Sequence, residues 1–488
     1  MNINKQRVFS NFIWRFLERF GAQGVTLIVS IVLARLLDPK VYGTVALITV
    51  ITTILQVFVD SGLGVALIQK IDADSLDFST VFYFNLFICV LLYCGLFLSA
   101  PSIAAFYDMS NLVAPIRVLG LLLIISGFKN IQGAYVSRHL LFKKYFFATL
   151  GGTISAAVVG ILVAYLGGGV WALIMQNLIN QTIDTIILWI LVKWRPTKEF
   201  SIFRLKSLLS YSWKLLVSSL FDTGWNQLRQ LIVGKVYSTN DLAFYNKGNE
   251  YPLYATTALT GSIDSVLLPV LSANQTDPMR VKELTRISIK VSSYIVFPMM
   301  AGLIGCSRQF VFVVLTDKWF PVIPYFITFC IVYAFYPMQT ANLSAIKAMG
   351  RSDLFLKLEL VKKAVDFCII LITIKLGVLW LAFGMVIACF FSLVINSWPN
   401  KNLLNYRFLE QLRDIFPNVI ISTIMGGLVY CISLIGLSDF LTLCIQIPFG
   451  IIVYLGISIF FKINSYIYIK DILTSYIKKG ADKTCQIF

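Results

Sequence analysis

Residues 79–100 read STVFYFNLFICVLLYCGLFLSA and contain no charged side chain. A helix needs about 20 mainly apolar residues to cross the hydrocarbon core of a bilayer, so this segment predicts a transmembrane helix. The whole chain has the same character, because 58% of its 488 residues are hydrophobic and only 13% are charged. Soluble domains are about 25% charged. The composition therefore excludes a soluble enzyme, a disordered chain and a secreted disulfide scaffold, and it indicates an integral membrane protein.

The same pattern recurs along the chain, so we predict an all-α fold with about 14 transmembrane helices. Helix breakers separate several of the segments, among them Asp38-Pro39, Pro101, Gly167–Gly169 and Gly350. No loop between them exceeds about 20 residues, which leaves no room for an extramembrane domain. The predicted spans are residues 11–36, 41–63, 79–100, 112–137, 145–166, 170–192, 207–236, 241–271, 281–306, 321–347, 354–375, 377–399, 411–435 and 438–461.

The loop charges predict the orientation. Loops on the side of the N-terminus hold twenty-two Lys and Arg residues, whereas the opposite loops hold four, Lys40, Arg308, Lys318 and Lys375. Cytoplasmic loops of membrane proteins are enriched in Lys and Arg, so both termini are expected in the cytoplasm. An even number of spans agrees with that orientation. This bias also accounts for the net charge of +17, and no nucleic-acid partner is expected.

An internal repeat divides the chain. Ile13–Leu17 aligns with Ser212–Leu216, and Ser61–Leu67 aligns with Ser262–Leu268, at a nearly constant offset of about 200 residues. Six spans separate the copies, so they share one orientation and form parallel repeats. We predict an N-terminal six-helix lobe at 1–200, a C-terminal six-helix lobe at 201–405, and two additional spans with a basic amphipathic cytoplasmic tail at 406–488.

Five stretches match the pattern of a known family. They are LARLLDPKVYG at 33–43 with DSGL at 60–63, RHLLFK at 138–143, GVWAL at 169–173 closing at WRP (194–196), DLAFYNK at 241–247 with LPVL at 268–271, and KAMGRSDL at 347–354 leading into LELVKK at 358–363. With these stretches, the chain resembles the multidrug/oligosaccharidyl-lipid/polysaccharide exporter superfamily, and specifically its Wzx-type polysaccharide transporter branch. The resemblance covers residues about 10–400.

The resemblance implies a function as well as a fold. The chain is expected to move a lipid-linked oligosaccharide repeat unit, carried on undecaprenyl diphosphate, from the inner to the outer leaflet of a bacterial cytoplasmic membrane. Transport would occur by alternating access of two lobes. It would serve the biosynthesis of O-antigen (lipopolysaccharide), capsule or exopolysaccharide. Expected partners are the lipid-linked oligosaccharide, anionic membrane lipids at the amphipathic tail, and the polysaccharide polymerase machinery.

Two alternatives remain open at this point. One is a cation-coupled drug exporter of the same superfamily, although the intramembrane Arg and Lys residues favour an anionic substrate. The other is a membrane polysaccharide polymerase or ligase, which short loops disfavour. The chain has no Gly-x4-Gly-Lys-Ser/Thr phosphate loop and a single histidine, His139. We therefore expect no enzymatic activity, no cofactor and no metal site.

Charged residues within a span are expensive and usually face a polar cavity or a partner, so they are the candidate substrate-binding residues. The first span carries Arg15, Glu18, Arg19 and Gln23 near one face. The two guanidinium groups would receive a diphosphate. The alternative is snorkelling toward the membrane surface with a local ion pair to Glu18.

A second set of candidates lies in the outer half of the membrane. Asp222, Asn226 and Arg229 share one face of the seventh span, and the eighth carries Lys247 and Glu250. Arg229 and Lys247 each lie roughly 10 Å from the outer helix ends at 1.5 Å per residue, which predicts that the two cations meet at one depth. The alternative is a structural ion-pair network in which Asp222 and Glu250 neutralise them.

Two further predicted spans carry candidate polar residues. The eleventh span carries Lys362 and Lys363, with Asp366 four residues after Lys362, and Lys362 is the cavity candidate. The sixth span carries a stripe that either binds sugar hydroxyls or joins helices through hydrogen bonds. That stripe consists of Gln176, Asn177, Asn180, Gln181 and Asp184.

Overall fold

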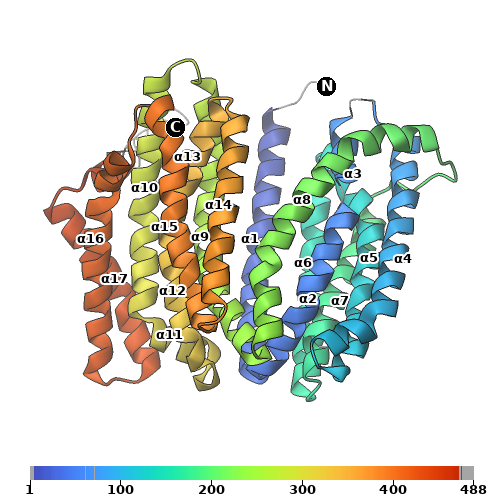
Figure 1. Ribbon diagram of the computed structural model, residues 1–488, viewed down its shortest axis with the longest axis horizontal. Helices are drawn as coiled ribbons and strands as arrows, with labels where there is room; N and C mark the ends of the chain where they lie inside the picture. Colours follow the sequence, from blue (N-terminus) through green and yellow to red (C-terminus); the bar gives the residue numbers. More distant parts are fainter. Residues whose placement is uncertain (1–4, 61, 71, 472–473, 475–488) are drawn as a thin grey trace, which may run out of the picture. The chain divides into compact units, whose positions relative to one another are not determined.

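The computed structural model describes the backbone of residues 5–60, 62–70, 72–471 and 474. It describes side chains from Gly21 onward, except at positions 211, 258, 259, 261, 262 and 264–266 within that range. Every regular element among these residues is a helix, which confirms the all-α fold class (Figure 1). The chain forms two compact units, Met1–Ala243 and Phe244–Phe488.

The first unit is a helical bundle in which α6 and α7 pack most closely. A Cβ atom on Gly152 of α6 would lie only 2.7 Å from the carbonyl oxygen of Asn180 on α7, so glycine permits this approach. Its elements are α1 (Lys5–Leu36), α2 (Pro39–Asp60), α3 (Leu63–Gln69), α4 (Ser75–Phe106), η1 (Ser110–Leu112), α5 (Val113–Arg138), α6 (Phe142–Tyr165), α7 (Val170–Leu191), α8 (Ile202–Val236) and the start of α9 (Thr239–Ala273).

The second unit begins within α9 and is likewise helical in its described part. One predicted span is broken here, because α12 ends at Ala334 and α13 starts at Tyr336 with Pro337 in its first turn. The remaining elements are α10 (Pro278–Gly305), α11 (Ser307–Leu315), η2 (Asp317–Val322), α12 (Ile323–Ala334), α13 (Tyr336–Ala348), α14 (Ser352–Thr373), α15 (Val378–Leu403), α16 (Phe408–Ile432), η3 (Ser433–Ile435) and α17 (Asp439–Phe460).

The helices have the lengths that a membrane requires. Among the described residues, nine helical segments are long and apolar enough to cross a bilayer. Five more long helices carry a larger share of polar residues: α1, α7, α8, α9 and α14. These five helices hold all of the candidate binding residues named above, including the polar stripe on α7, and these polar residues lower their mean hydropathy. The multi-pass membrane fold is confirmed, and the exact number of spans stays a prediction.

Most predicted helix boundaries are observed. Helix α1 ends at Leu36, and α2 starts with Pro39, which needs no hydrogen-bond donor at that position. The turn before α7 uses Gly167 and Gly169 with φ of 79° and 52°, a region that glycine adopts without steric cost. Gly43 of the LARLLDPKVYG stretch has a packing role, because a Cβ there would lie 1.7 Å from the carbonyl oxygen of Thr239.

The expectation that Pro101 ends a helix is wrong. Helix α4 continues through Pro101 to Phe106. Proline has no N–H to donate to the carbonyl four residues earlier, which here belongs to Phe97. Arg117 of α5 donates its Nε–H to that carbonyl at 3.3 Å, and its guanidinium lies 4.1 Å from the centre of the Phe97 ring. A donor from a neighbouring helix therefore replaces the missing hydrogen bond.

Helices α16 and α17 pack on α10 within the second unit. Asp414 of α16 accepts from Arg286 at 2.7 Å and from the Tyr406 hydroxyl at 2.8 Å, and it lies 3.0 Å from the Lys290 ammonium. The Tyr454 hydroxyl of α17 donates to the carbonyl oxygen of Tyr294 at 2.8 Å. The last pair of helices is thus joined to the second unit by ionic and hydrogen-bonded contacts.

Replacing Gly426 by Ala should destabilise this α10–α16 contact by about 1–3 kcal/mol, because a Cβ would lie 2.8 Å from the carbonyl oxygen of Ala301 and force the helices apart. The matched control is Gly427→Ala, since nothing lies within 4 Å of a Cβ at Gly427. Thermal unfolding in detergent measures the difference. Equal unfolding temperatures for the two variants would contradict the close packing.

Packing and sequence repeat divide the chain at different places. Helix α8 packs on α2, α3 and α4, so the first compact unit extends to Ala243 and not to residue 200. Compactness does not measure the internal repeat, so the division into 1–200, 201–405 and 406–488 stays a prediction. In the tail, residues 464–471 are helical, and Tyr466 and Ile469 pack against a buried cluster that includes Tyr294 and Tyr454. The rest of the expected amphipathic tail lies outside the described residues apart from position 474.

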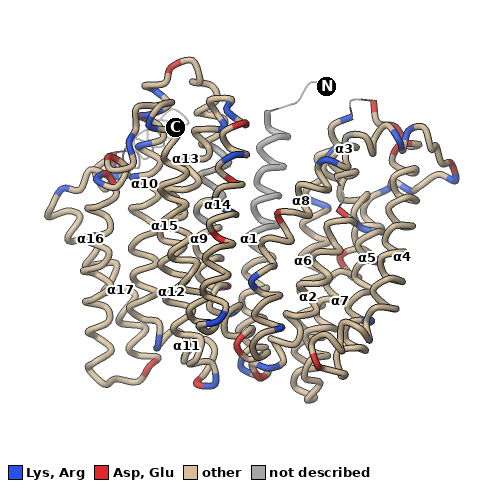
Figure 2. Tube along the Cα trace, viewed as in Figure 1, with Lys and Arg blue, Asp and Glu red and all other residues tan. Residues whose placement is uncertain are grey.

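One end of the first unit gathers the basic loops. Arg138 donates to the carbonyl oxygen of Leu67, Lys144 donates to that of Leu191, and Arg204 pairs with Asp74. The Arg204 guanidinium, through this hydrogen bond, holds the pKa of the Asp74 carboxyl below its usual range. Lys and Arg are concentrated around α3 and the neighbouring helix ends (Figure 2). We expect this end to lie in the cytoplasm.

Cysteine labelling tests that orientation. A cysteine at Lys198 should react only with a reagent that enters the cytoplasm, and a cysteine at Gly168 should react with an impermeant reagent from outside. Both variants need a background in which the nine native cysteines are replaced. A cytoplasmic Gly168 would refute the predicted topology.

Candidate functional site

Lys247 is the most deeply buried cation among the predicted site residues whose side chains are described. It lies on α9 in the second unit, and the residue is 4% exposed. Its ammonium nitrogen lies 2.7 Å from Oε2 of Glu250, one turn further along the helix, and 5.8 Å from the centre of the Tyr251 ring. The expected pairing of Lys247 with Glu250 is therefore present. The Glu250 side chain is more exposed than that of Lys247, at 23% against 5%.

The helix around Lys247 is held by close contacts. A Cβ on Gly248 would lie 2.6 Å from Cβ of Tyr325, so glycine permits α9 to approach α12. The Tyr333 hydroxyl of α12 donates to Oδ1 of Asn249 at 2.8 Å. The Tyr251 ring packs edge-on against Phe310 of α11, with centroids 5.5 Å apart. These contacts fix the backbone that carries Lys247 and Glu250.

Arg229 is buried on α8 in the first unit. The residue is 9% exposed, whereas Asp222 and Asn226 on the same helix are exposed. The three residues recur at helical spacing but do not share one environment. Arg229 and Lys247 belong to different compact units. Their convergence at one depth therefore stays a prediction.

The structure describes only one of the candidate side chains on α1, and it shows an acidic partner for the candidate on α14. Gln23 of α1 is exposed, and the side chains of Arg15 and Arg19 lie outside the described residues. Lys362 of α14 has its ammonium 2.6 Å from Oε1 of Glu359. Glu359, three residues before Lys362 on the same helix, was not predicted as its partner, whereas Asp366 was noted four residues after it. Lys362 is thus a neutralised cation in a polar helix.

A buried ion pair in the first unit was not predicted. Lys129 of α5 has its ammonium 2.6 Å from Oδ2 of Asp184 on α7, and the two side chains are 17% and 3% exposed. Gln181 extends the contact, because its amide donates to the Ser126 hydroxyl at 3.1 Å. Asp184 and Gln181 belong to the polar stripe of the sixth predicted span. Within the stripe, these two residues therefore serve helix–helix contacts.

A signal for this pair exists in the sequence. Lys129 interrupts the apolar segment LLLIISGFKNI at 121–131, and an isolated cation in a span needs a partner. Asp184 is the matching acid two spans later. Combining the two observations would have identified the pair.

The arrangement provides cations paired with acids on long helices that carry polar residues. Such groups can bind an anion and return to their acids afterwards, without making or breaking a covalent bond. Among the described residues, no group of three His, Cys, Asp or Glu side chains is placed to hold a metal ion.

The family follows from a comparison of the sequence with family models. A model described as "Polysaccharide biosynthesis protein" matches residues 32–324, more than half of the 488 residues. The chain belongs to this family of polysaccharide biosynthesis proteins. The resemblance inferred from the five sequence stretches is thereby confirmed.

Curated relatives within the family carry related names. The teichuronic acid biosynthesis protein TuaB of Bacillus subtilis is 24% identical over 392 residues, which are 78% of this chain and 80% of TuaB. The succinoglycan biosynthesis transport protein ExoT of Rhizobium meliloti is 23% identical over 317 residues, 65% of this chain and 64% of ExoT. The chain thus matches slightly less than two thirds of ExoT.

The fold is shared with a solved flippase. The structure of the lipid II flippase MurJ in an inward closed conformation superposes with a TM-score of 0.73, covering 92% of this chain and 99% of MurJ. Identity is 15%, so the likeness establishes the fold of this family member. It confirms the expected fold of a multi-helix membrane protein.

Proposed function

We propose that the chain transports a lipid-linked oligosaccharide repeat unit from the inner to the outer leaflet of a bacterial cytoplasmic membrane, for surface polysaccharide biosynthesis. The carrier is undecaprenyl diphosphate, and transport occurs by alternating access. Both termini lie in the cytoplasm. The polysaccharide polymerase machinery receives the exported unit, and anionic lipids contact the basic tail.

The main support is the combination of family and fold. A chain of the polysaccharide biosynthesis family has, over nine tenths of its length, the fold of the lipid II flippase MurJ. The buried cations add chemical support. Arg229 and Lys247 are suited to a substrate that carries a diphosphate, because a desolvated cation attracts an anion more strongly than a hydrated one.

The drug-exporter alternative lacks this support. The matching family is one of polysaccharide biosynthesis, and ExoT is named a succinoglycan biosynthesis transport protein. A polymerase or ligase is disfavoured for the same reason. We therefore propose that the protein moves its substrate chemically unchanged.

Reconstitution tests the proposal directly. Vesicles containing the purified protein and a fluorescent undecaprenyl diphosphate oligosaccharide should expose the glycan on the opposite leaflet, where an added glycosidase removes it. Protein-free vesicles and vesicles with an unrelated multi-pass protein are the controls. Equal protection in all three would refute transport. A lengthened glycan without other enzymes would refute the expectation that the protein is not an enzyme.

A further inference from the structure

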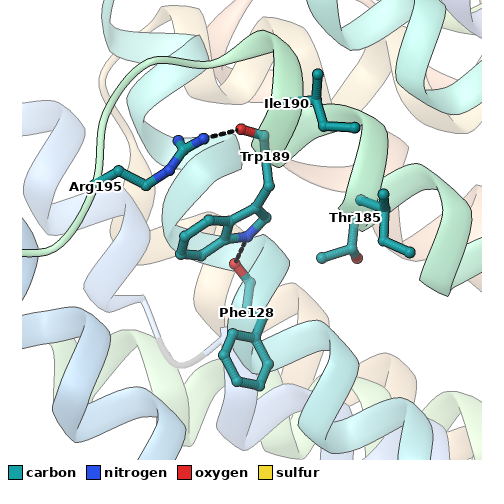
Figure 3. Close-up of a pocket in the computed structure, with 6 residues that line it drawn as sticks. Phe128, Thr185, Trp189, Ile190 and Arg195 are labelled. Atoms are coloured by element: carbon teal, nitrogen blue, oxygen red, sulfur yellow. Dashed lines mark hydrogen bonds between the residues drawn. The ribbon is translucent and has the colours of Figure 1, made fainter.

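An apolar groove opens between α5 and α7 in the first unit (Figure 3). Its volume is about 390 Å³, and it is lined by Phe128, Thr185, Ile186, Trp189, Ile190 and Arg195. Ile190 of α7 is 72% exposed, so the groove opens to the surroundings of this helix, which we expect to be lipid. The Thr185 hydroxyl donates to the carbonyl oxygen of Gln181 at 2.6 Å and is satisfied within α7. The interior of the groove is thus suited to a hydrocarbon chain.

The walls of the groove are fixed by aromatic contacts. The indole N–H of Trp189 donates to the carbonyl oxygen of Phe128 at 3.0 Å (Figure 3). The Trp189 ring also packs edge-on against Phe82 and Phe128, with centroids 5.9 and 6.4 Å apart. A groove with rigid walls binds a chain at a smaller entropic cost than a surface that must first become ordered.

One of the lining residues, Arg195, carries a positive charge. The Arg195 guanidinium lies 5.1 Å from the centre of the Trp189 ring. It donates to the carbonyl oxygens of Val192 at 2.6 Å and Trp194 at 2.7 Å, and to that of Trp189 (Figure 3). These acceptors use three of the five N–H donors of the guanidinium. Two N–H donors remain on the guanidinium group, and these three hydrogen bonds fix its position.

The apolar part of the groove and its charged residue lie at different positions along the chain of α7 and the segment after it. Thr185 to Ile190 covers roughly 8 Å of helix at 1.5 Å per residue, and Arg195 follows the last residue of the helix, Leu191. The adjoining segment carries exposed Lys193 and Lys198 beside one exposed acid, Glu199. This end is therefore cationic at the level where lipid headgroups begin.

We propose that this groove is a binding site for an anionic phospholipid. The first part of an acyl chain fills the groove between Phe128 and Ile190, and the phosphodiester accepts from Arg195. Two remaining donors suit the single charge of a phosphodiester, whereas a diphosphate carrier would require more cations than the one among these lining residues. Basic pockets between helices on the cytoplasmic side are a recurring mode of lipid recognition.

Native mass spectrometry of the intact protein tests the site, with phosphatidylglycerol and phosphatidylcholine of the same chains at equal concentration. The wild-type protein should retain more phosphatidylglycerol, and Arg195→Gln should reduce that retention about fivefold, the effect of one cation at a membrane surface. Retention of phosphatidylcholine should fall less, because its choline cation offsets the negative charge of its phosphodiester. The matched control is Arg117→Gln, because Arg117 also lies over an aromatic ring and donates to a carbonyl but does not line this groove.

Two more variants separate the headgroup from the chain. Ile186→Trp fills the groove without removing a charge and should reduce retention of both lipids. Arg195→Lys keeps the charge with fewer donors and should give intermediate retention of phosphatidylglycerol, which also tests the site if Arg195→Gln fails to fold. Retention that is equal for the two lipids, or unaffected by both Arg195 variants, would overturn the proposal. Displacement of phosphatidylglycerol by equimolar undecaprenyl diphosphate in an Arg195-dependent manner would overturn it too, by assigning the groove to the carrier.

Discussion

Asp184→Leu should lower the free energy of unfolding by about 3–5 kcal/mol, because it leaves the Lys129 ammonium without its carboxylate in an apolar environment. The two atoms are 2.6 Å apart in the native protein, and the Asp184 side chain is 3% exposed. Lys129→Met should cost a similar amount by leaving Asp184 unpaired. The double variant Lys129→Met/Asp184→Leu should recover most of the loss, since apolar side chains of similar size replace both charges.

Unfolding in detergent, followed by the loss of helical signal with added denaturant, measures these differences. The control is Arg280→Ala, which removes one partner of the exposed Arg280–Glu283 pair and should cost at most about 1 kcal/mol. If Asp184→Leu costs no more than Arg280→Ala, the ion pair does not join α5 to α7. If the double variant is as unstable as the single ones, the loss arises from packing and not from an uncompensated charge.

The sequence predicts features that depend on local composition. The absence of charge in residues 79–100 specifies a span, and Asp38-Pro39 specifies a junction, because bilayer thickness and the missing proline N–H act on the segment itself. The Lys247–Glu250 pair is equally local, since residues three apart lie on one helix face. These features were predicted correctly.

Features that depend on helix neighbours were missed. Pro101 leaves the Phe97 carbonyl without its helical donor, and the helix continues because Arg117 from α5 supplies one. The Lys129–Asp184 pair requires α5 to lie beside α7, which residue spacing within one span does not reveal. The groove beside Trp189 likewise depends on the α5–α7 contact, so no sequence motif indicated it.

The buried cations lead to the second large expected effect, which concerns transport. Arg229→Ala and Lys247→Ala should each reduce surface polysaccharide by about tenfold or more at an unchanged amount of membrane protein, the loss expected for one charge-assisted hydrogen bond to the substrate. Both residues are at most 9% exposed, so each attracts an anion in a poorly hydrated setting. Arg229→Lys should retain part of the activity if charge matters more than the bidentate geometry of arginine.

Two further variants decide between a substrate-binding role and a purely structural one. Lys235→Gln removes a partly exposed cation from the same helix as Arg229 and should leave surface polysaccharide nearly normal. Glu250→Gln removes the acidic partner of Lys247 and leaves the positive charge of Lys247 in place. If Lys247 binds the substrate anion, this variant should still support transport. If Glu250→Gln and Lys247→Ala both remove the protein from the membrane, the pair acts as a structural contact. Normal surface polysaccharide in the Arg229→Ala/Lys247→Ala double variant would reject the proposed role of both cations, because no positive charge would then remain at either position to receive the diphosphate.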